Sequence, residues 1–295
     1  MKILVTGKNG QLGRSIHKIV NANIEADCNF NSNEFIFVGR NELDFSNENN
    51  ICQYFSDNKF DIIVNCAAYT QVDKAEEEQD LANQVNHLSV KQLAAIASSQ
   101  QTKLIHISTD YVFDGESGQS YIESDATTPI NIYGKTKSSG EKALQEVMPT
   151  NVTIIRTSWV YSEYGNNFVK TMLRLGKERH ELNVVDDQIG SPTYAADLAE
   201  VVLKIIDNQD YRVKEKSTEV YHYSNKGKVS WCDFAKEIFK IAKIDCEVKS
   251  ITTEQYPTPA ERPKCSLLNN EKIEKVFSIK QKDWKKSLQA CLSCL

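Results

Sequence analysis

Near its N-terminus the chain reads KILVTGKNGQLG at residues 2–13, and the rest of the predicted architecture builds on this segment. The apolar run at 2–5 is typical of a buried strand, and a helical pattern follows at 14–20. Gly7, Gly10 and Gly13 lie between them, spaced as G-x-x-G-x-x-G. Such glycines allow a tight turn and a close approach of the backbone to a pyrophosphate, which helix N–H groups then bind. We therefore predict a dinucleotide site here; the alternative is an ordinary turn between strand and helix.

Strand and helix patterns alternate along the first half of the chain. This alternation predicts a Rossmann-type doubly wound parallel sheet with helices on both faces. The second half is less regular, and we expect it to form a smaller mixed α/β lobe that binds the substrate. The strand-like runs lie at 34–38, 61–69, 103–107 and 152–156, and the helical patterns at 81–98 and 138–145.

No change of composition marks a linker between the two parts. We assign residues 1–160 to the NAD(P)-binding domain and residues 161–295 mainly to the substrate-binding lobe. We also assign about 185–210 to the first domain, so that the chain crosses between the two.

Residues at the ends of the predicted strands are the first candidates for a site, because ligands in such sheets bind beyond the carboxyl ends of the strands. Arg40 follows the run at 34–38, and an arginine there suits the 2′-phosphate of NADPH. An exposed arginine after a strand is also commonplace, and NADH therefore stays open. Asp44 and Phe45 follow closely, and we place them at the edge of the adenine pocket.

Small and hydroxyl-bearing side chains end two further strands. Ala67 and Ala68 would leave room for a flat cofactor, unless they serve close core packing. Ser108 and Thr109 place hydroxyls at the next strand end, where Ser and Thr are also ordinary turn residues.

Tyr133 and Lys137 lie four positions apart, just before a run that favours a helix. Residues i and i+4 share one helix face, so we expect the phenol and the ammonium in the same cleft. An ammonium favours the ionised phenol, lowers its pKa and makes it a usable proton donor. By itself the pair is weak evidence, since a solvated helix face would produce it too.

Composition excludes several classes of protein. The 35 Lys and Arg against 40 Asp and Glu give a net charge of −5, without a basic run, which argues against a nucleic-acid binder. The longest apolar stretches are strand-length, so we expect no membrane span, and the absence of a signal sequence predicts a cytoplasmic protein. Among the eight cysteines only Cys291 and Cys294 form C-x-x-C; with no second pair we expect reduced thiols and no metal site.

Four signals now occur in one order: the glycine turn, Ser108-Thr109, Tyr133-x-x-x-Lys137 and a strand ending in Ser158-Trp159. This order resembles the extended short-chain dehydrogenase/reductase superfamily. Longer segments are similar to the dTDP-4-dehydrorhamnose reductase family, and the resemblance covers nearly the whole chain. These segments are 67–76, 108–115, 129–137, 187–193 and 262–268.

The resemblance implies NAD(P)H-dependent reduction of the C4 ketone of dTDP-4-dehydro-L-rhamnose to dTDP-L-rhamnose. By this resemblance Tyr133 would donate the proton to the ketone oxygen as general acid. Lys137 would lower the pKa of Tyr133 and hold the nicotinamide ribose. Thr109 would hydrogen-bond the same oxygen and stabilise its developing charge.

The resemblance also implies the residues that bind cofactor and substrate. Asp110, Val72 and Trp159 match positions near the sugar, and Arg262, with Lys264, is the weaker candidate for the pyrophosphate of the dTDP-sugar. The cofactor positions are Gly7, Gly10, Gln11, Leu12, Gly13, Arg40, Asp44, Phe45, Ala67, Ala68, Tyr69, Thr70, Tyr133 and Lys137.

Some members of this family bind Mg²⁺ at a dimer contact through glutamates. We identify no matching glutamates, so Mg²⁺ is left open but not predicted, and a homodimer stays open as well. A reductase or epimerase of a different nucleotide-sugar is one alternative, although neither Cys66 nor His106 suggests the acid–base pair of an epimerase. A non-catalytic regulatory subunit of the same fold is another, disfavoured because Thr109, Tyr133 and Lys137 are all present.

Overall fold

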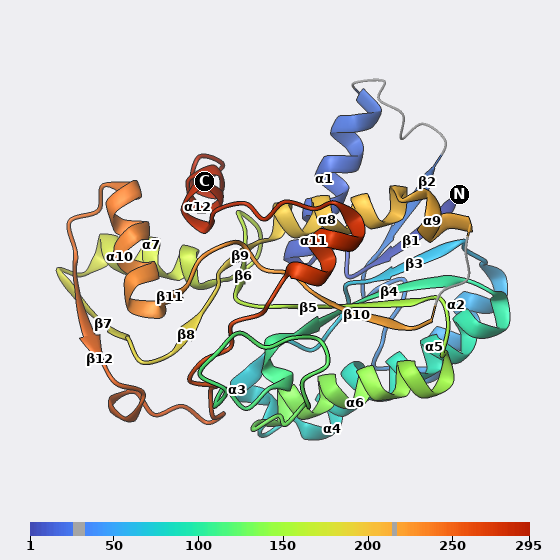
Figure 1. Ribbon diagram of the computed structural model, residues 1–295, viewed down its shortest axis with the longest axis horizontal. Coiled ribbons are helices and arrows are strands. Elements are labelled where there is room, and N and C mark those ends of the chain that lie inside the picture. Colours follow the sequence, from blue (N-terminus) through green and yellow to red (C-terminus); the bar gives the residue numbers. More distant parts are fainter. Residues whose placement is uncertain (26–32, 214–216) are drawn as a thin grey trace.

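The computed structural model describes residues 1–25, 33–213 and 217–295, and a six-stranded sheet forms its centre. All six strands are parallel, in the order β10-β5-β4-β3-β1-β2. The predicted Rossmann-type sheet with a smaller lobe is confirmed (Figure 1). The strands are β1 (Lys2–Thr6), β2 (Glu34–Val38), β3 (Ile62–Asn65), β4 (Lys103–Thr109), β5 (Val152–Thr157) and β10 (Glu219–His222).

Helices cover both faces of the sheet, which buries it on both sides (Figure 1). The central strands β3 and β5 are therefore buried along their whole length. One face carries α1 (Gln11–Glu25), α8 (Ala195–Asp207) and α11 (Glu271–Phe277); the other carries α2 (Glu48–Asp57), α5 (Ser89–Gln100) and α6 (Ile132–Val147).

The glycine turn between β1 and α1 is built by close backbone approaches. Gly7 has φ +69°, and a Cβ atom there would lie 2.9 Å from the backbone of Cys66 and Ala67. A Cβ atom on Gly13 would lie 2.3 Å from the carbonyl oxygen of Gly7. Only glycine fits both positions, and the turn therefore closes tightly enough to expose the first N–H groups of α1.

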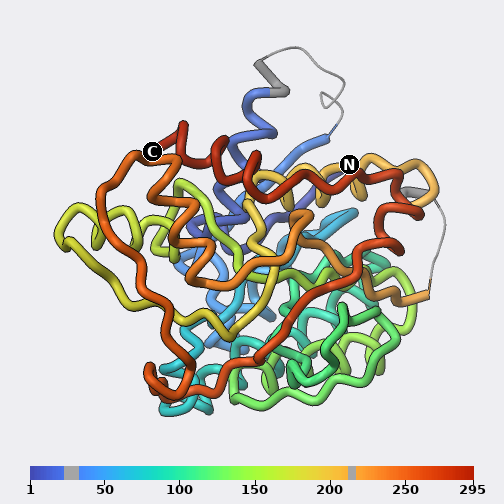
Figure 2. Tube along the Cα trace, turned by 60° about the vertical axis from the view of Figure 1, so that its left-hand side comes forward, coloured from blue at the N-terminus to red at the C-terminus, as the bar shows by residue number. Residues whose placement is uncertain are grey.

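The smaller lobe lies beside the sheet, on the left of Figure 1. It contains the parallel strands β7 (Glu181–Val185) and β12 (Glu247–Ile251), and the helices α7 (Phe168–Glu178), α10 (Trp231–Ala242) and α12 (Trp284–Leu292). After β12 the chain returns to the sheet as α11 and then rejoins the smaller lobe as α12 (Figures 1 and 2). Residues beyond 210 thus supply both a sheet strand, β10, and a covering helix, α11. The division into two domains stays a prediction.

The segment at 81–98, which we predicted as one helix, is interrupted. It comprises α4 (Gln79–Asn83), a π-helical turn (Gln84–Leu88) and α5. The buried Asn86 in this turn accepts a hydrogen bond from the backbone N–H of Tyr69 (2.9 Å) and donates one to its carbonyl oxygen (3.0 Å). The wide turn therefore fixes the loop that follows β3.

Sequence periodicity missed α2, α11, α12 and β12, which are short or weakly patterned. The remaining elements are short: α3 (Val72–Ala75), α9 (Gln209–Val213), β6 (Val160–Tyr161), β8 (Ile189–Gly190), β9 (Thr193–Tyr194), β11 (Val229–Ser230) and 3₁₀ turns at Asp110–Val112 and Thr253–Gln255.

In the described ranges the cysteines are free thiols, with Cys291 buried and Cys294 exposed, whereas Cys28 lies outside those ranges. The same residues include no cluster of three or more His, Cys, Asp or Glu side chains suited to a metal ion. None of the helices described is both long and apolar enough to cross a bilayer.

Candidate active site

A cleft of about 960 Å³ opens at the carboxyl ends of β1, β3, β4 and β5. Its lining includes every residue that we predicted for the site except Arg262 and Lys264. The glycine turn, Arg40, Asp44 and Phe45 line its cofactor end, and Thr109, Tyr133 and Lys137 line its interior. The structure thus brings together residues that lie up to about half the chain apart in sequence.

The start of α6 sets the position of Tyr133. The Asn131 side chain caps the helix by accepting a hydrogen bond from the N–H of Gly134 (2.8 Å). Gly134 lies so close to the 3₁₀ turn after β4 that a Cβ atom would be 2.1 Å from the carbonyl oxygen of Tyr111. This contact brings the first turn of α6 against the end of β4, where Tyr133 and Thr109 line the same cleft and the Thr109 hydroxyl acts on the pKa of Tyr133.

The pKa of Tyr133 is raised to about 12, chiefly because the phenol is buried. The Thr109 hydroxyl lowers this pKa and the charge of Asp110 raises it. The expectation that Lys137 lowers the pKa of Tyr133 stays a prediction. In the structure, Lys137 Nζ donates to the carbonyl oxygen of Ile107 (2.6 Å) and contacts His106 Nε2 (3.2 Å).

Asp110 is a buried carboxylate at the cleft wall, 1% exposed. Its Oδ1 accepts a hydrogen bond from Thr109 Oγ1 (3.0 Å), and Thr109 Oγ1 accepts one from the N–H of Tyr111 (3.2 Å). Its Oδ2 accepts no well-formed hydrogen bond from the described residues. Burial raises the pKa of Asp110 to about 6, although the nearby hydroxyls of Ser266 and Thr109 oppose the shift. This carboxylate can accept a hydrogen bond from a ligand hydroxyl.

An aromatic wall, defined as Trp159, Phe168, Trp231 and Phe234, lines the opposite side of the cleft. The rings of Trp159 and Trp231 stack with centroids 3.5 Å apart and planes 8° apart, and Phe168 packs against Trp231. Trp159 has φ +46°, and a Cβ atom on Gly190 would lie 2.5 Å from its ring. A strained backbone and a neighbouring glycine thus hold this indole in place.

Three members of the aromatic wall were missed at the sequence level: Phe168, Trp231 and Phe234. They lie on amphipathic helices, α7 and α10, where aromatic residues at helical spacing indicate core packing. One signal was available in the sequence. Trp231 is the first residue of α10, next to the cap Ser230, and its long side chain could have been recognised as a candidate for the cleft.

The whole chain, residues 1–295, matches the protein family described as RmlD substrate binding domain. It is 41% identical to a dTDP-4-dehydrorhamnose reductase of Aggregatibacter actinomycetemcomitans, over 98% of this chain and 97% of that protein. The chain belongs to the dTDP-4-dehydrorhamnose reductase family. The resemblance noted in the sequence is thereby confirmed.

Solved structures of this reductase family agree with the fold. A dTDP-4-dehydrorhamnose reductase of Clostridium acetobutylicum is 43% identical with a TM-score of 0.90, covering 100% of this chain and 99% of that one. A dTDP-4-dehydrorhamnose reductase of Bacillus anthracis, solved in complex with NADP, is 38% identical with a TM-score of 0.89, covering 100% and 99%.

Two cations that we predicted to bind the pyrophosphate of the family's dTDP-sugar are already paired. Arg262 makes a two-pronged ion pair with Asp73, in which Nη2 lies 2.7 Å from Oδ2, and it does not line the cleft. The hydrogen bond from Arg262 is the main reason that the pKa of Asp73 is lowered. Lys264 lies 3.3 Å from Glu116, and both are exposed. The pair of Arg262 and Asp73 instead joins α3 to the segment that leads back from the smaller lobe.

Gln11 and Arg40, two of the predicted cofactor residues, also make contacts within the protein. The Gln11 side chain bonds the carbonyl oxygen of Val160 (3.1 Å), Ser162 Oγ (2.9 Å) and Asn167 Nδ2 (2.9 Å). It therefore ties the start of α1 to the loop after β6. Arg40 is exposed and lies within 3.3 Å of the Asp44 carboxylate.

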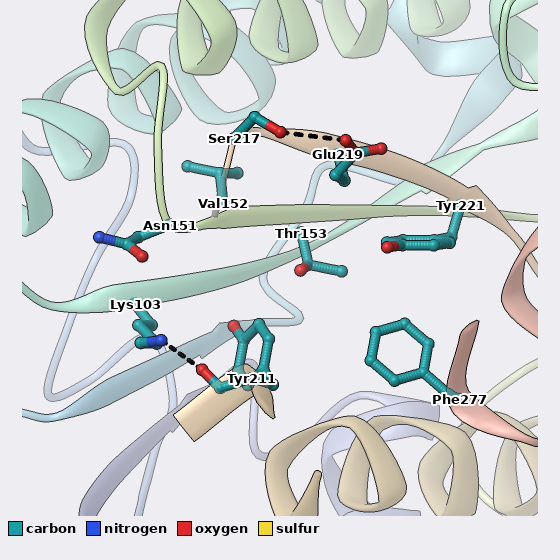
Figure 3. Close-up of a pocket in the computed structure, with 9 residues that line it drawn as sticks. All are labelled: Lys103, Asn151, Val152, Thr153, Tyr211, Ser217, Glu219, Tyr221 and Phe277. Carbon is teal, nitrogen blue, oxygen red and sulfur yellow. Dashed lines mark hydrogen bonds between the residues drawn. The ribbon is translucent and has the colours of Figure 1, made fainter. Parts of the chain in front are cut away.

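A second, small pocket near β5 and β10 does not suit a reductase substrate (Figure 3). Its volume is about 10 Å³, enough for a single water molecule and far too small for a nucleotide-sugar. Within it Lys103 Nζ donates to the carbonyl oxygen of Tyr211, and Ser217 Oγ donates to Glu219 (3.1 Å). None of the predicted site residues lines it.

Proposed function

We propose that Tyr133 protonates the C4 oxygen of dTDP-4-dehydro-L-rhamnose in an NADPH-dependent reduction that yields dTDP-L-rhamnose. The chain is an NAD(P)-dependent oxidoreductase of the family whose relatives bear the name of this reaction. The observation that carries the proposal is the shared cleft. Thr109, Tyr133 and Lys137 meet in the interior of a cavity whose far end is the glycine turn.

The cofactor end fits a dinucleotide. The turn at Gly7 and Gly13 has no room for a side chain, and it presents the N-terminus of α1 to the cleft. A pyrophosphate would be bound there by backbone N–H groups and the helix dipole. When bound, the cofactor supplies the hydride that reduces C4.

Tyr133 and Thr109 would stabilise the negative charge that develops on the ketone oxygen. Because the pKa of Tyr133 is about 12, the phenol is protonated at neutral pH and enters the reaction as an acid. The Thr109 hydroxyl lines the same cleft and can hydrogen-bond the same oxygen when its proton turns from Asp110 Oδ1 to the substrate. Asp110 Oδ2 would accept a hydrogen bond from a sugar hydroxyl, and Trp159 would pack against the apolar face of the sugar.

NADPH is the proposed cofactor. Arg40 lies at the carboxyl end of β2 and lines the cleft beside Asp44, where the ribose 2′ position of a dinucleotide falls in this fold. The Bacillus anthracis relative was solved with NADP. An NADH-dependent enzyme would be expected to place a carboxylate at the position of Gly39 or Arg40.

The test is the oxidation of NADPH and NADH, followed by absorbance, with dTDP-4-dehydrorhamnose generated in the assay. We expect oxidation that depends on the dTDP-sugar and is faster with NADPH. No oxidation with either cofactor, from protein shown to bind one, would overturn the assigned substrate. A faster reaction with NADH would overturn the role of Arg40.

A further inference from the structure

A chain of four buried polar side chains extends from Lys137 into the sheet. Lys137 Nζ lies 3.2 Å from His106 Nε2, and His106 Nδ1 lies 3.0 Å from Asn65 Nδ2. Asn65 Oδ1 in turn lies 2.7 Å from Thr6 Oγ1. Each of the four residues is at most 1% exposed. Only the lysine lines the cleft, so the others have no direct contact with a ligand.

The backbone fixes the direction of the hydrogen bonds in this chain. Thr6 Oγ1 accepts hydrogen bonds from the N–H groups of Cys66 and Ala67, each at 3.1 Å. Its own proton is therefore free to donate to Asn65 Oδ1, and the amide nitrogen of Asn65 must then face His106 Nδ1. An amide nitrogen only donates. His106 Nδ1 is thus an acceptor, and the proton of the neutral imidazole lies on Nε2.

This tautomer presents an N–H donor to the amine of Lys137. A neutral amine can accept that hydrogen bond through its lone pair, while still donating to the carbonyl oxygen of Ile107. An ammonium has no lone pair and would meet His106 donor to donor.

We propose that His106, held as the Nε2–H tautomer by Asn65 and Thr6, is a positioning residue that stabilises the neutral amine of Lys137 and so lets Lys137 give up a proton during turnover. This inference rests on the proposed reduction. In each cycle the hydride forms the new C–H bond at C4, and the Tyr133 O–H bond breaks as its proton moves to the substrate oxygen. The tyrosinate then regains a proton from the Lys137 ammonium by way of a water or hydroxyl in the cleft that both residues line, and the Lys137 amine accepts the hydrogen bond of His106. Solvent returns one proton to Lys137 after product leaves.

The other charged groups around Lys137 do not fix it as an ammonium. Glu141 lies one turn further along α6. Its carboxylate is bound by Arg156 (2.7 Å) and by Ser108 (2.5 Å), so its negative charge is already paired. Burial lowers the pKa of Lys137 to about 8, although Glu141 and the Cys66 thiol oppose the shift. Burial also raises the pKa of Cys66 to about 12, so the thiol is neutral. On the cleft side stand the Tyr133 phenol and the Asp110 carboxylate.

Burial and the neighbouring Lys137 hold the pKa of His106 well below its usual value. The imidazole therefore stays neutral at physiological pH, and its tautomer rather than its charge acts on Lys137.

The test is an NMR titration of lysine ¹³Cε signals in the cofactor-free full-length protein, with Lys137→Met identifying the signal. In H106Q the new amide can turn its oxygen toward Lys137 and accept from the ammonium. In N65D the carboxylate accepts the Nδ1 proton, so that Nε2 becomes an acceptor. We expect each variant to raise the titration midpoint of Lys137 by about one pH unit. The control, H222Q, changes a buried histidine that does not contact Lys137 and should leave the midpoint unchanged.

A cycle of variants separates tautomer from charge. If the tautomer is responsible, N65D adds little in the H106Q background, because the imidazole that it would switch is gone. Fully additive shifts, or an unchanged midpoint in both single variants, would overturn the inference. If H106Q does not fold, the titration midpoint of Lys137 in N65D alone tests the inference. The alkaline limit of kcat should move upward with the midpoint. Absent turnover in the wild type would overturn the proposed reaction and leave the titration result standing.

Discussion

One wall of the cleft consists of strand ends and the first turns of α6, whereas the other consists of stacked aromatic rings. On the first wall Thr109, Tyr133 and Lys137 are held by hydrogen bonds to backbone and to buried polar groups. On the aromatic wall Trp159 and Trp231 are held by each other and by a glycine behind them. The comparison indicates that contiguous motifs encode the chemistry, while packing between distant segments shapes the place for the sugar.

The largest effect is expected on the first wall. Tyr133→Phe removes the proton donor and keeps the ring, so kcat should fall by a factor of about 10² or more while NADPH affinity is largely kept. Steady-state kinetics and a fluorescence titration with NADPH measure the two quantities. Unchanged turnover would show that another group protonates the substrate.

Trp231→Ala tests the aromatic wall. Loss of the stacked partner frees Trp159, and we expect KM for the dTDP-sugar to rise about fivefold, with a smaller change in kcat, since an aromatic pair contributes about 1 kcal/mol. Trp284→Ala is the matched control, because Trp284 packs against Phe234 but does not line the cleft. It should lower stability and leave KM nearly unchanged. Equal rises of KM in both variants would show that the wall acts only through stability.

Asp110→Asn tests the role of the buried carboxylate beside Thr109 on the first wall. In the wild type the pKa of about 6 predicts that sugar binding weakens as pH falls through 6, because the carboxylate is then protonated. The asparagine variant should bind the sugar several-fold more weakly and without this pH dependence. The measurement is KM between pH 5 and 8. A wild-type KM that does not change across pH 6 would contradict the assignment.

The same substitution has an opposite effect on stability. The folded pKa of Asp110 lies above that of an unfolded aspartate, so the folded state binds more protons between about pH 4 and 6, and stability falls as pH rises through that window. At pH 8 Asp110→Asn should therefore be more stable than the wild type, with an unfolding free energy higher by roughly 1–3 kcal/mol. The difference should shrink toward pH 4. Thermal unfolding at both pH values measures it.

The smallest effect is expected away from both walls. Arg262→Gln removes the ion pair with Asp73, which is partly exposed, and should cost about 1 kcal/mol of unfolding free energy with less than a twofold change in KM. Denaturant unfolding and KM for the dTDP-sugar check it. A tenfold rise in KM would instead restore Arg262 as a partner of the pyrophosphate.

Much of the first wall could be predicted from the sequence, because its determinants are local. Glycine spacing, a strand pattern and a Tyr-x-x-x-Lys pair each lie within a few residues, and their order along the chain fixes where they meet in a parallel sheet. The strand at 34–38 was predicted with the bounds that the structure has.

The remaining features of the site depend on contacts between segments that are far apart in the sequence, and no local sequence pattern predicts such contacts. Trp231 becomes a wall residue only because α10 packs against the end of β5, more than 70 residues earlier in the chain. The Arg262 prediction rested on charge, which says nothing about the carboxylate that already holds it. The direction of Lys137 depends on His106, whose place in a buried strand pattern suggested only packing.

The late completion of the sheet has a consequence during synthesis on the ribosome. The first five strands are made by residue 157, but β10, α8 and α11, which close one edge and one face, come only with residues 195–277. At roughly 5–20 residues per second, the part of this apolar face that α8 and α11 cover stays exposed for on the order of ten seconds in each nascent chain. A polypeptide stopped near residue 160 would keep that part of the face exposed and should aggregate.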